Sequence, residues 1–136
     1  MSRTYLLDTD IISDAARNPN GNTALRMMRV GQDQLFTSVI VLAELKYGLK
    51  RNPLTGARMQ IELLIKSLDV RELPLEAAHH YGKLRCDLER RGRPIGANDY
   101  WIAAHALAED AVLVSNNLRE FERMTGLHLE NWLEQM

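Results

Sequence analysis

The sequence lacks the features that mark secreted and membrane proteins. It has one cysteine, Cys86, which excludes an intrachain disulfide and agrees with a reducing compartment. No apolar run approaches the roughly 20 residues of a membrane-spanning helix. Arg3, Asp8 and Asp10 interrupt any hydrophobic segment near the N-terminus that could serve as a signal peptide. We therefore expect a cytoplasmic protein with no membrane contact.

The chain also lacks a strong excess of either charge. Its 17 Lys and Arg residues nearly balance 18 Asp and Glu residues, for a net charge of -1. Bulk attraction to nucleic acid is not implied, so any site for a polyanion must be local. The chain has 136 residues, of which 46% are hydrophobic and 26% charged. These values are ordinary for globular proteins and predict one domain over residues 1–136 with a sizeable core.

Strand and helix patterns alternate along the chain, with short loops between them. Short apolar runs predict strands at residues 5–7, 35–37, 70–73, 111–115 and 127–129. Helical patterns lie at residues 11–16, 23–30, 39–47, 58–68, 75–91, 99–108 and 118–121. Asp10, Ser38 and Asn98 are predicted N-caps. The alternation predicts an α/β sandwich with a mostly parallel central sheet.

Three acids stand where acids are uncommon. Asp8 directly follows the first apolar run, Glu44 lies inside a nearly apolar helix, and Asp99 occupies the first turn of an alanine-rich helix. A polar cluster, residues 115–117, ends the other strongly apolar strand. If both strands are central and parallel, Asp8 and Asn117 emerge side by side, in the crevice where α/β sheets bind ligands.

Each of these residues also has an ordinary structural explanation. Glu44 could lie at the solvated edge of its helix, Asp99 could complement the helix dipole, and Asn117 could be a turn residue. The occurrence of all these unusual polar residues in one chain favours a functional site over separate structural roles. Carboxylates that lie together without basic partners repel one another, and this repulsion raises their pKa values. A bound divalent cation removes the repulsion. Oxygen ligands favour Mg²⁺ or Mn²⁺ over Zn²⁺, so the residues predict metal-assisted hydrolysis of a phosphate ester.

Two known families share parts of this pattern. Residues 8–12, which follow an apolar strand, resemble the opening motif of haloacid-dehalogenase-type phosphatases, and residues 112–116 resemble the second motif of that family. That family needs a lysine and then a further acidic motif downstream. Here the last lysine is Lys83 and the last aspartate is Asp110. This resemblance therefore covers only part of the family's pattern.

The other resemblance runs almost from end to end of the chain. Four segments resemble, in order, the motifs of PIN-domain ribonucleases: residues 7–13, 38–48, 94–106 and 113–121. The closing segment 126–132 is also similar to that family. Within it, the chain looks like the VapC toxins of VapBC toxin–antitoxin pairs. The resemblance implies a PIN fold, an endoribonuclease that depends on Mg²⁺ or Mn²⁺, a homodimer, and a small antitoxin that blocks the site and binds operator DNA.

The resemblance also implies roles for single residues. Asp8, Glu44 and Asp99 fall on the metal-binding acids of the family. The chain departs from the family in having Asp10 where asparagine is usual, and Asn117 where many members have a fourth acid. We expect Asn117 to contribute through its carbonyl oxygen or a held water, and Ser115 to orient water or ligand. We hypothesise that Asp10 partly compensates for the missing charge.

Six basic residues are candidates for contact with the RNA backbone: Lys46, Lys50, Arg51, Arg90, Arg91 and Arg93. The first three follow Glu44 in its helix, and the others form a basic loop before the Asp99 helix. Lysine and arginine can bind phosphates, but they also favour helix C-termini for reasons unconnected with a ligand. The pattern leaves both explanations open.

The sequence supports two functions of different classes. The three acids favour an enzyme, because a site without a function has no reason to keep carboxylates that repel one another. The neutral Asn117 favours a weakly active PIN-like binding module that acts mainly through its antitoxin and operator DNA. For the enzyme, the resemblance suggests structured RNA such as tRNA as the substrate, with specificity from splayed single-stranded bases.

Overall fold

The computed structural model describes residues 3–53 and 56–134. At its centre lies a sheet with strands β1 (Tyr5–Leu7), β2 (Leu35–Ser38), β3 (Asp69–Arg71), β4 (Val112–Val114) and β5 (Leu129–Glu130). The strand order is β3-β2-β1-β4-β5, and every pairing in this sheet is parallel. The predicted mostly parallel sheet is therefore confirmed.

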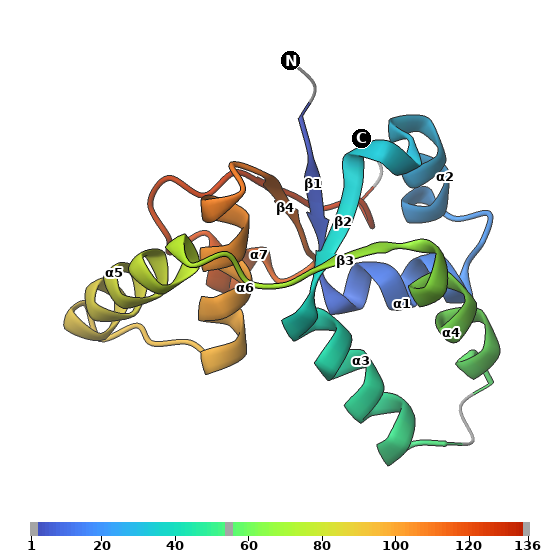
Figure 1. The fold of residues 1–136 in the computed structure, drawn as a ribbon, viewed down its shortest axis with the longest axis horizontal. Helices are drawn as coiled ribbons and strands as arrows, with labels where there is room; N and C mark the ends of the chain where they lie inside the picture. Colours follow the sequence, from blue (N-terminus) through green and yellow to red (C-terminus); the bar gives the residue numbers. More distant parts are fainter. Residues whose placement is uncertain (1–2, 54–55, 135–136) are drawn as a thin grey trace.

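Helices cover both sides of this sheet. They are α1 (Thr9–Arg17), α2 (Asn22–Val30), α3 (Val39–Arg51), α4 (Arg58–Ser67), α5 (Glu76–Arg90), α6 (Ala97–Ala108) and α7 (Leu118–Phe121), with a 3-10 turn at Gln32–Gln34. Figure 1 shows α1, α2 and α4 on one side of the strands and α5 and α6 on the other. Helix α1 packs against α2, α3 and α4, and α5 packs along α6. The predicted α/β sandwich is confirmed.

The two central strands, β1 and β4, bring the candidate site residues to one edge of the sheet. Leu6, Leu7, Leu113 and Val114 are fully buried, as continuous apolar runs predict for strands covered on both faces. Leu6 pairs with Leu113, and Leu7 pairs with Val114. The residues that come next in each chain segment therefore leave the sheet as neighbours, at the point where the strand order reverses.

The predicted N-cap of α1 is wrong. Asp8, rather than Asp10, caps this helix: its backbone is extended, and its Oδ1 accepts a hydrogen bond of 2.8 Å from the backbone N–H of Thr9. Only Asp8 separates the end of β1 from the start of α1, so this single extended residue is the cap. Asp10 consequently lies in the first turn of the helix.

The other predicted caps have different outcomes. Ser38 caps α3 as predicted, because its hydroxyl accepts a hydrogen bond from the backbone N–H of Ile40. Asn98 does not cap α6. That helix begins at Ala97, with Gly96 as its N-cap, so Asn98 lies in the first turn with its side chain free for another contact.

The two edge strands are shifted from their predicted positions. β3 covers Asp69–Arg71 rather than residues 70–73, and β5 covers Leu129–Glu130 rather than residues 127–129. Their bounds follow from pairing with the neighbouring strand, in which Phe36 lies opposite Asp69 and Val114 opposite Glu130. Apolar residues alone did not indicate this register.

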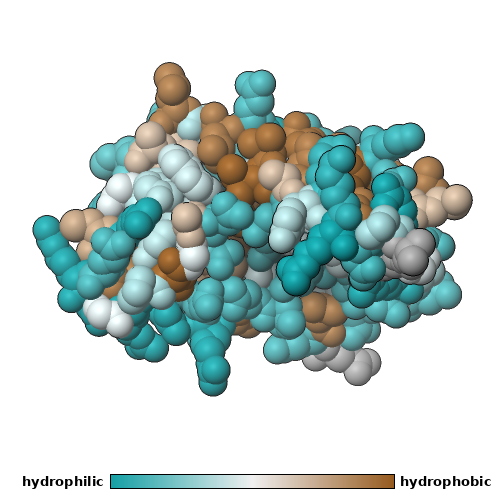
Figure 2. Space-filling view, turned by 90° about the horizontal axis from the view of Figure 1, so that it is seen from below, coloured by the Kyte–Doolittle hydropathy of each residue, from teal (hydrophilic) through white to brown (hydrophobic). Residues whose placement is uncertain are grey.

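Exposed hydrophobic side chains are concentrated on helices. Among the large ones are Met28 on α2, Tyr47 on α3, Met59 and Leu63 on α4, and Leu75 before α5. Seen from below, the face of the molecule in Figure 2 is mostly hydrophilic, with hydrophobic side chains along its upper edge. In the part of the chain that the structure describes, no helix combines the length and apolar character needed to cross a membrane.

Candidate active site

The polar residues that follow β1 and β4 are hydrogen-bonded to one another. The Ser115 hydroxyl donates to Asp8 Oδ2 at 2.8 Å, and the backbone N–H of Asn117 donates to the Ser115 oxygen at 2.9 Å. Asp8 is 6% exposed and Ser115 is fully buried. The structure therefore brings these three predicted residues together, and Ser115 fixes the orientation of the Asp8 carboxylate.

Asp10 adds a second carboxylate beside Asp8. Its Oδ2 accepts a hydrogen bond of 3.1 Å from the backbone N–H of Asn116. Its Oδ1 is buried and has no hydrogen-bond partner among the described residues. Burial raises the pKa of Asp10, and the Asp10 charge contributes to the raised pKa of Asp8. Burying a carboxylate oxygen without a partner is energetically unfavourable. A bound cation, or a water that donates a hydrogen bond, would supply the missing interaction.

Glu44 reaches the site from α3. Its Oε1 accepts a hydrogen bond of 2.7 Å from the Thr9 hydroxyl, and its Oε2 accepts one of 3.4 Å from the Asn98 side chain. The side chain is half-buried. Glu44 therefore faces the N-terminal ends of α1 and α6, where two other acids lie, rather than projecting into solvent at the edge of its helix.

Asp99 faces an acid that the sequence analysis missed. The side chain of Glu120 on α7 lies near its carboxyl group and contributes to raising the pKa of Asp99. Glu120 Oε2 also accepts a hydrogen bond of 3.1 Å from the Asn117 side chain. Asn117 and Glu120 are three residues apart at the start of a helical turn, a spacing that places side chains on one face. That spacing is the signal from which Glu120 could have been identified.

These acids are electrostatically uncompensated. Burial raises the pKa of Asp8 to about 6, with a contribution from the Asp10 charge. Burial also raises the pKa of Asp99 to about 7, together with the Asp8 charge and the neighbouring Glu120 side chain. None of the ion pairs between described residues involves Asp8, Glu44 or Asp99. The cluster therefore attracts positive charge.

The donor set fits a hard divalent cation. Every side-chain group in the cluster offers oxygen, and no histidine or cysteine takes part, which favours Mg²⁺ or Mn²⁺. As the side chains stand, no three His, Cys, Asp or Glu residues in the described ranges are arranged to hold one ion. Binding an ion would require the partly exposed Glu44 and Asp99 side chains to turn toward Asp8.

The structure does not gather the six predicted basic residues into one surface. Arg91 forms an ion pair of 2.9 Å with Asp87 and donates to the backbone carbonyl of Arg123, so it holds α5 to a neighbouring loop. Lys46 and Lys50 border a separate hollow between α3 and α4. Arg51 lies exposed at the end of α3, and Arg93 lies exposed after α5.

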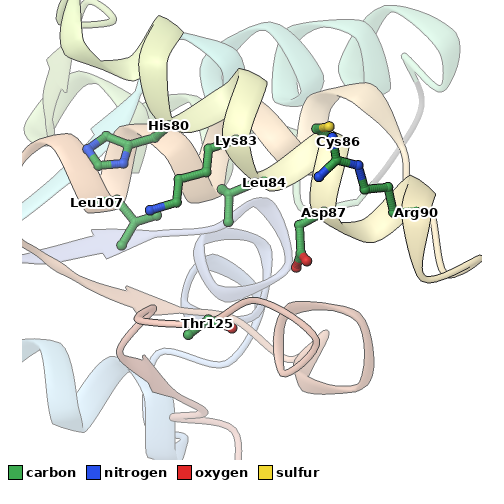
Figure 3. A pocket seen from close by; sticks show the side chains of 8 residues that line it. All are labelled: His80, Lys83, Leu84, Cys86, Asp87, Arg90, Leu107 and Thr125. Carbon is green, nitrogen blue, oxygen red and sulfur yellow. The ribbon is translucent and has the colours of Figure 1, made fainter.

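A cavity of about 650 Å³ lies between α5, the end of α6 and Thr125. Arg90 lines it, together with His80, Lys83 and Leu107 (Figure 3). Cys86 also belongs to this lining and is exposed. None of the acids described above contributes to this cavity, so its lining is separate from the carboxylate cluster.

Comparison with known proteins shows which family the chain resembles. The PIN domain family model matches residues 5–127. Ribonuclease VapC2 of Rickettsia felis is 36% identical over 130 residues, which cover 94% of this chain and 97% of that protein. The tRNA(fMet)-specific endonuclease VapC of Shigella flexneri is 35% identical over 129 residues, again covering 94% of this chain and 97% of the relative.

Solved structures give the same result. The VapBC2 complex of Rickettsia felis, bound to a DNA fragment from its promoter, contains a chain that matches with a TM-score of 0.83 and 35% identity, over 95% of this chain and 98% of that one. A chain of VapBC-1 from nontypeable Haemophilus influenzae matches with a TM-score of 0.83 and 36% identity, over 96% of this chain and 99% of that one.

Proposed function

This chain belongs to the VapC branch of the PIN-domain family, and we propose that it is a metal-dependent endoribonuclease that acts as the toxin of a type II toxin–antitoxin pair. One observation carries the proposal. Carboxylates from β1, α3, α6 and α7 converge beyond the ends of the central strands without a basic partner among the described residues. Repulsion between these carboxylates is energetically unfavourable unless a cation is bound among them.

Asp8, Glu44 and Asp99 are the residues that would hold Mg²⁺ or Mn²⁺, with Glu120 as a fourth acid. When bound, a divalent cation neutralises the carboxylates, polarises a phosphoryl oxygen and lowers the pKa of water. Other residues of this chain position the acids. Ser115 fixes Asp8, and Asn117 holds Glu120 through its side-chain amide. Asn117 is thus a positioning residue in this proposal.

The raised pKa of Asp99 links the site to pH. With a pKa of about 7, the Asp99 carboxyl group keeps part of its proton near neutral pH. A cation binds the ionised form, so this proton must leave when the ion arrives. Cleavage would consequently rise with pH up to about neutrality. A carboxylate freed in this way is also suited to accept a proton during hydrolysis.

The relatives suggest the substrate and the partners. We propose structured cytoplasmic RNA, with tRNA first, because the Shigella flexneri relative is named a tRNA(fMet)-specific endonuclease. We also propose a homodimer and an antitoxin that binds operator DNA within the complex, since the matching structures are VapBC assemblies and one holds promoter DNA. Exposed side chains such as Met28, Tyr47 and Met59 offer apolar surface for these contacts.

The binding-module alternative was motivated by the neutral Asn117. Glu120 removes that motivation, because it supplies an acid to the same part of the site and is held there by Asn117 itself. The raised pKa values of Asp8 and Asp99 also support an active site, since charge repulsion of this kind is found where ionised groups have a function.

The test is cleavage of purified structured RNAs, including initiator tRNA, by the purified protein with Mg²⁺, Mn²⁺ or EDTA. We expect discrete cuts with either metal and none with EDTA. The Asp8→Asn variant should not cut, and the exposed Asp33→Asn variant serves as its control. Cutting that survives both EDTA and Asp8→Asn would overturn the metal-site mechanism. Absence of cutting by the wild-type protein would favour the binding module.

A further inference from the structure

Helices α1 and α3 present matching rows of side chains beside the acid cluster. One row is Thr9, Ser13 and Arg17; the other is Glu44, Gly48 and Asn52. Each row has a spacing of four residues, so its members lie on one face of the helix. Together the two rows line a hollow of about 140 Å³, which we call the α1–α3 cleft.

The α1–α3 cleft is continuous with the candidate active site. The hydrogen bond from Thr9 to Glu44, 2.7 Å long, lies at the end of the cleft nearest the acids. From there each row runs eight residues, or about 12 Å, away from the acids. Figure 1 shows α1 and α3 diverging from the end of the central strands. A molecule whose phosphate lies at the acids can therefore place its next group in this cleft.

Gly48 is the least expected residue of the cleft. It lies in the interior of α3, where glycine costs roughly 0.5–1 kcal/mol relative to alanine. Its backbone is not left-handed, and a Cβ atom built there would meet no atom within 4 Å. Neither the helix nor the packing of described residues therefore requires glycine at this position. The open space in front of it lets a ligand approach α3 closely.

We propose that the α1–α3 cleft binds one nucleotide of the RNA, next to the phosphate that is cut. The inference rests on the proposed nuclease function and extends it to substrate recognition. The cleft has room for about one unstacked base. Its buried floor, formed by Leu45, Leu49 and Ile61, suits the face of a base. Single-stranded loops, whose bases can be splayed out, are the RNA segments that could use it.

The rim of the cleft offers polar groups for the edge and backbone of that nucleotide. Asn52 carries both amide donors and an amide acceptor, and Ser13 carries a hydroxyl, so the two can read the edge of a base. Arg17 is exposed at the far end and forms no ion pair with any residue in the described ranges. Its guanidinium is available to the next phosphate along the chain.

Substitution of Gly48 tests the proposal without removing any group. Gly48→Leu would fill the cleft, and Gly82→Leu is a matched control, because Gly82 also lies exposed inside a long helix with no atom within 4 Å of its would-be Cβ. We expect both variants to melt at or slightly above the temperature of the wild type, because each replaces a glycine inside a helix. Gly48→Leu should lower kcat/KM for RNA cleavage about tenfold or more, mainly through KM, whereas Gly82→Leu should cut normally.

A binding measurement separates failure of the cleft from failure of the nuclease function. Fluorescence anisotropy with a labelled single-stranded RNA of mixed sequence should show weaker binding to Gly48→Leu than to the wild type or Gly82→Leu, whether or not the RNA is cut. Equal binding and equal cleavage would overturn the proposal. If Gly48→Leu changed only inhibition by the antitoxin, the cleft would be a site for antitoxin peptide rather than RNA.

A second variant tests the reading of the base. Asn52→Asp replaces two amide donors by an acceptor while keeping the shape of the side chain. We expect a changed nucleotide preference beside the cut in a randomised single-stranded loop, determined by sequencing the 5′ and 3′ ends of the products. An unchanged preference in Asn52→Asp would show that Asn52 does not read the base.

Discussion

The candidate active site has a strand side and a helix side, which differ in rigidity. On the strand side, Asp8 is nearly fully buried and its two oxygens accept hydrogen bonds from Thr9 and Ser115. On the helix side, Glu44, Asp99 and Glu120 are partly exposed. Burial, the Asp8 charge and the neighbouring Glu120 side chain raise the pKa of Asp99. The strand side thus fixes the position of the site, and the helix side can adjust when a cation arrives.

Replacing the fixed acid should have the largest effect. Asp8→Asn keeps the shape of the side chain but removes the charge at the centre of the cluster, so we expect RNA cleavage to fall at least about a hundredfold, because even groups that merely support a metal ligand are worth 10–100-fold. Initial rates at several Mg²⁺ concentrations measure this. Full activity in the variant would mean that the strand side does not hold the cation.

Glu120→Gln tests whether the helix side is also necessary. The amide keeps the hydrogen-bonding shape but removes the acid, so we expect cleavage to fall about tenfold or more and the Mg²⁺ concentration for half-maximal activity to rise. Glu122→Gln is the control, because Glu122 lies exposed just beyond α7. If the two variants behaved alike, Glu120 would be a structural partner of Asp99 and not part of the site.

The two sides also differ in how well the sequence predicted them. Asp8 and Ser115 were identified because each directly follows a buried strand, and the parallel pairing of β1 with β4 makes their meeting unavoidable. Glu120 was missed because α7 has four residues, too few for a periodic pattern, and its side chain could equally have pointed to solvent. Its partner Asn117 was found, but its relation to Glu120 was not.

For residues beside the site, too, the sequence did not predict which contacts the side chains make. Asp10 and Asn98 were expected to cap helices, but the chain turns directly from strand to helix at Asp8, and α6 begins at Ala97. Asn98 is therefore free to hold Glu44. The role of Arg91 was also open in the sequence, because a charge pattern does not say whether a guanidinium faces solvent or, as here, Asp87 and the carbonyl of Arg123.

The raised pKa of Asp99 on the helix side gives a smaller, measurable effect on stability. The pKa of Asp99 is about 7 in the folded chain, against an ordinary value of 3.8. Well below pH 3.8 the carboxyl group is protonated in both the folded and the unfolded chain. As the pH rises from 4 to 7, the unfolded chain loses this proton and the folded chain retains it. The contribution of Asp99 to stability is therefore lost across this window.

We accordingly expect the free energy of unfolding, measured with urea in EDTA, to fall more between pH 5 and pH 8 in the wild type than in Asp99→Asn. The difference should be about 1 kcal/mol, because partial exposure of Asp99 to solvent reduces the effect. His105, whose pKa is lowered by burial, acts in the opposite direction but is present in both proteins. An equal pH dependence would mean that Asp99 titrates normally.

Asp10 should give the smallest effect, because it belongs to the strand side but has only one of its oxygens hydrogen-bonded. Asp10→Asn keeps an acceptor for the Asn116 N–H and removes one charge near Asp8, which lowers the pKa of Asp8. If Asp10 helps to attract the cation through its charge alone, the Mg²⁺ concentration for half-maximal cleavage should rise about two- to fivefold, less than the roughly 10–100-fold effect of groups that support a metal ligand directly. Unchanged metal dependence would show that Glu120 alone replaces the acid absent at Asn117, and that the fixed side of the site needs only Asp8.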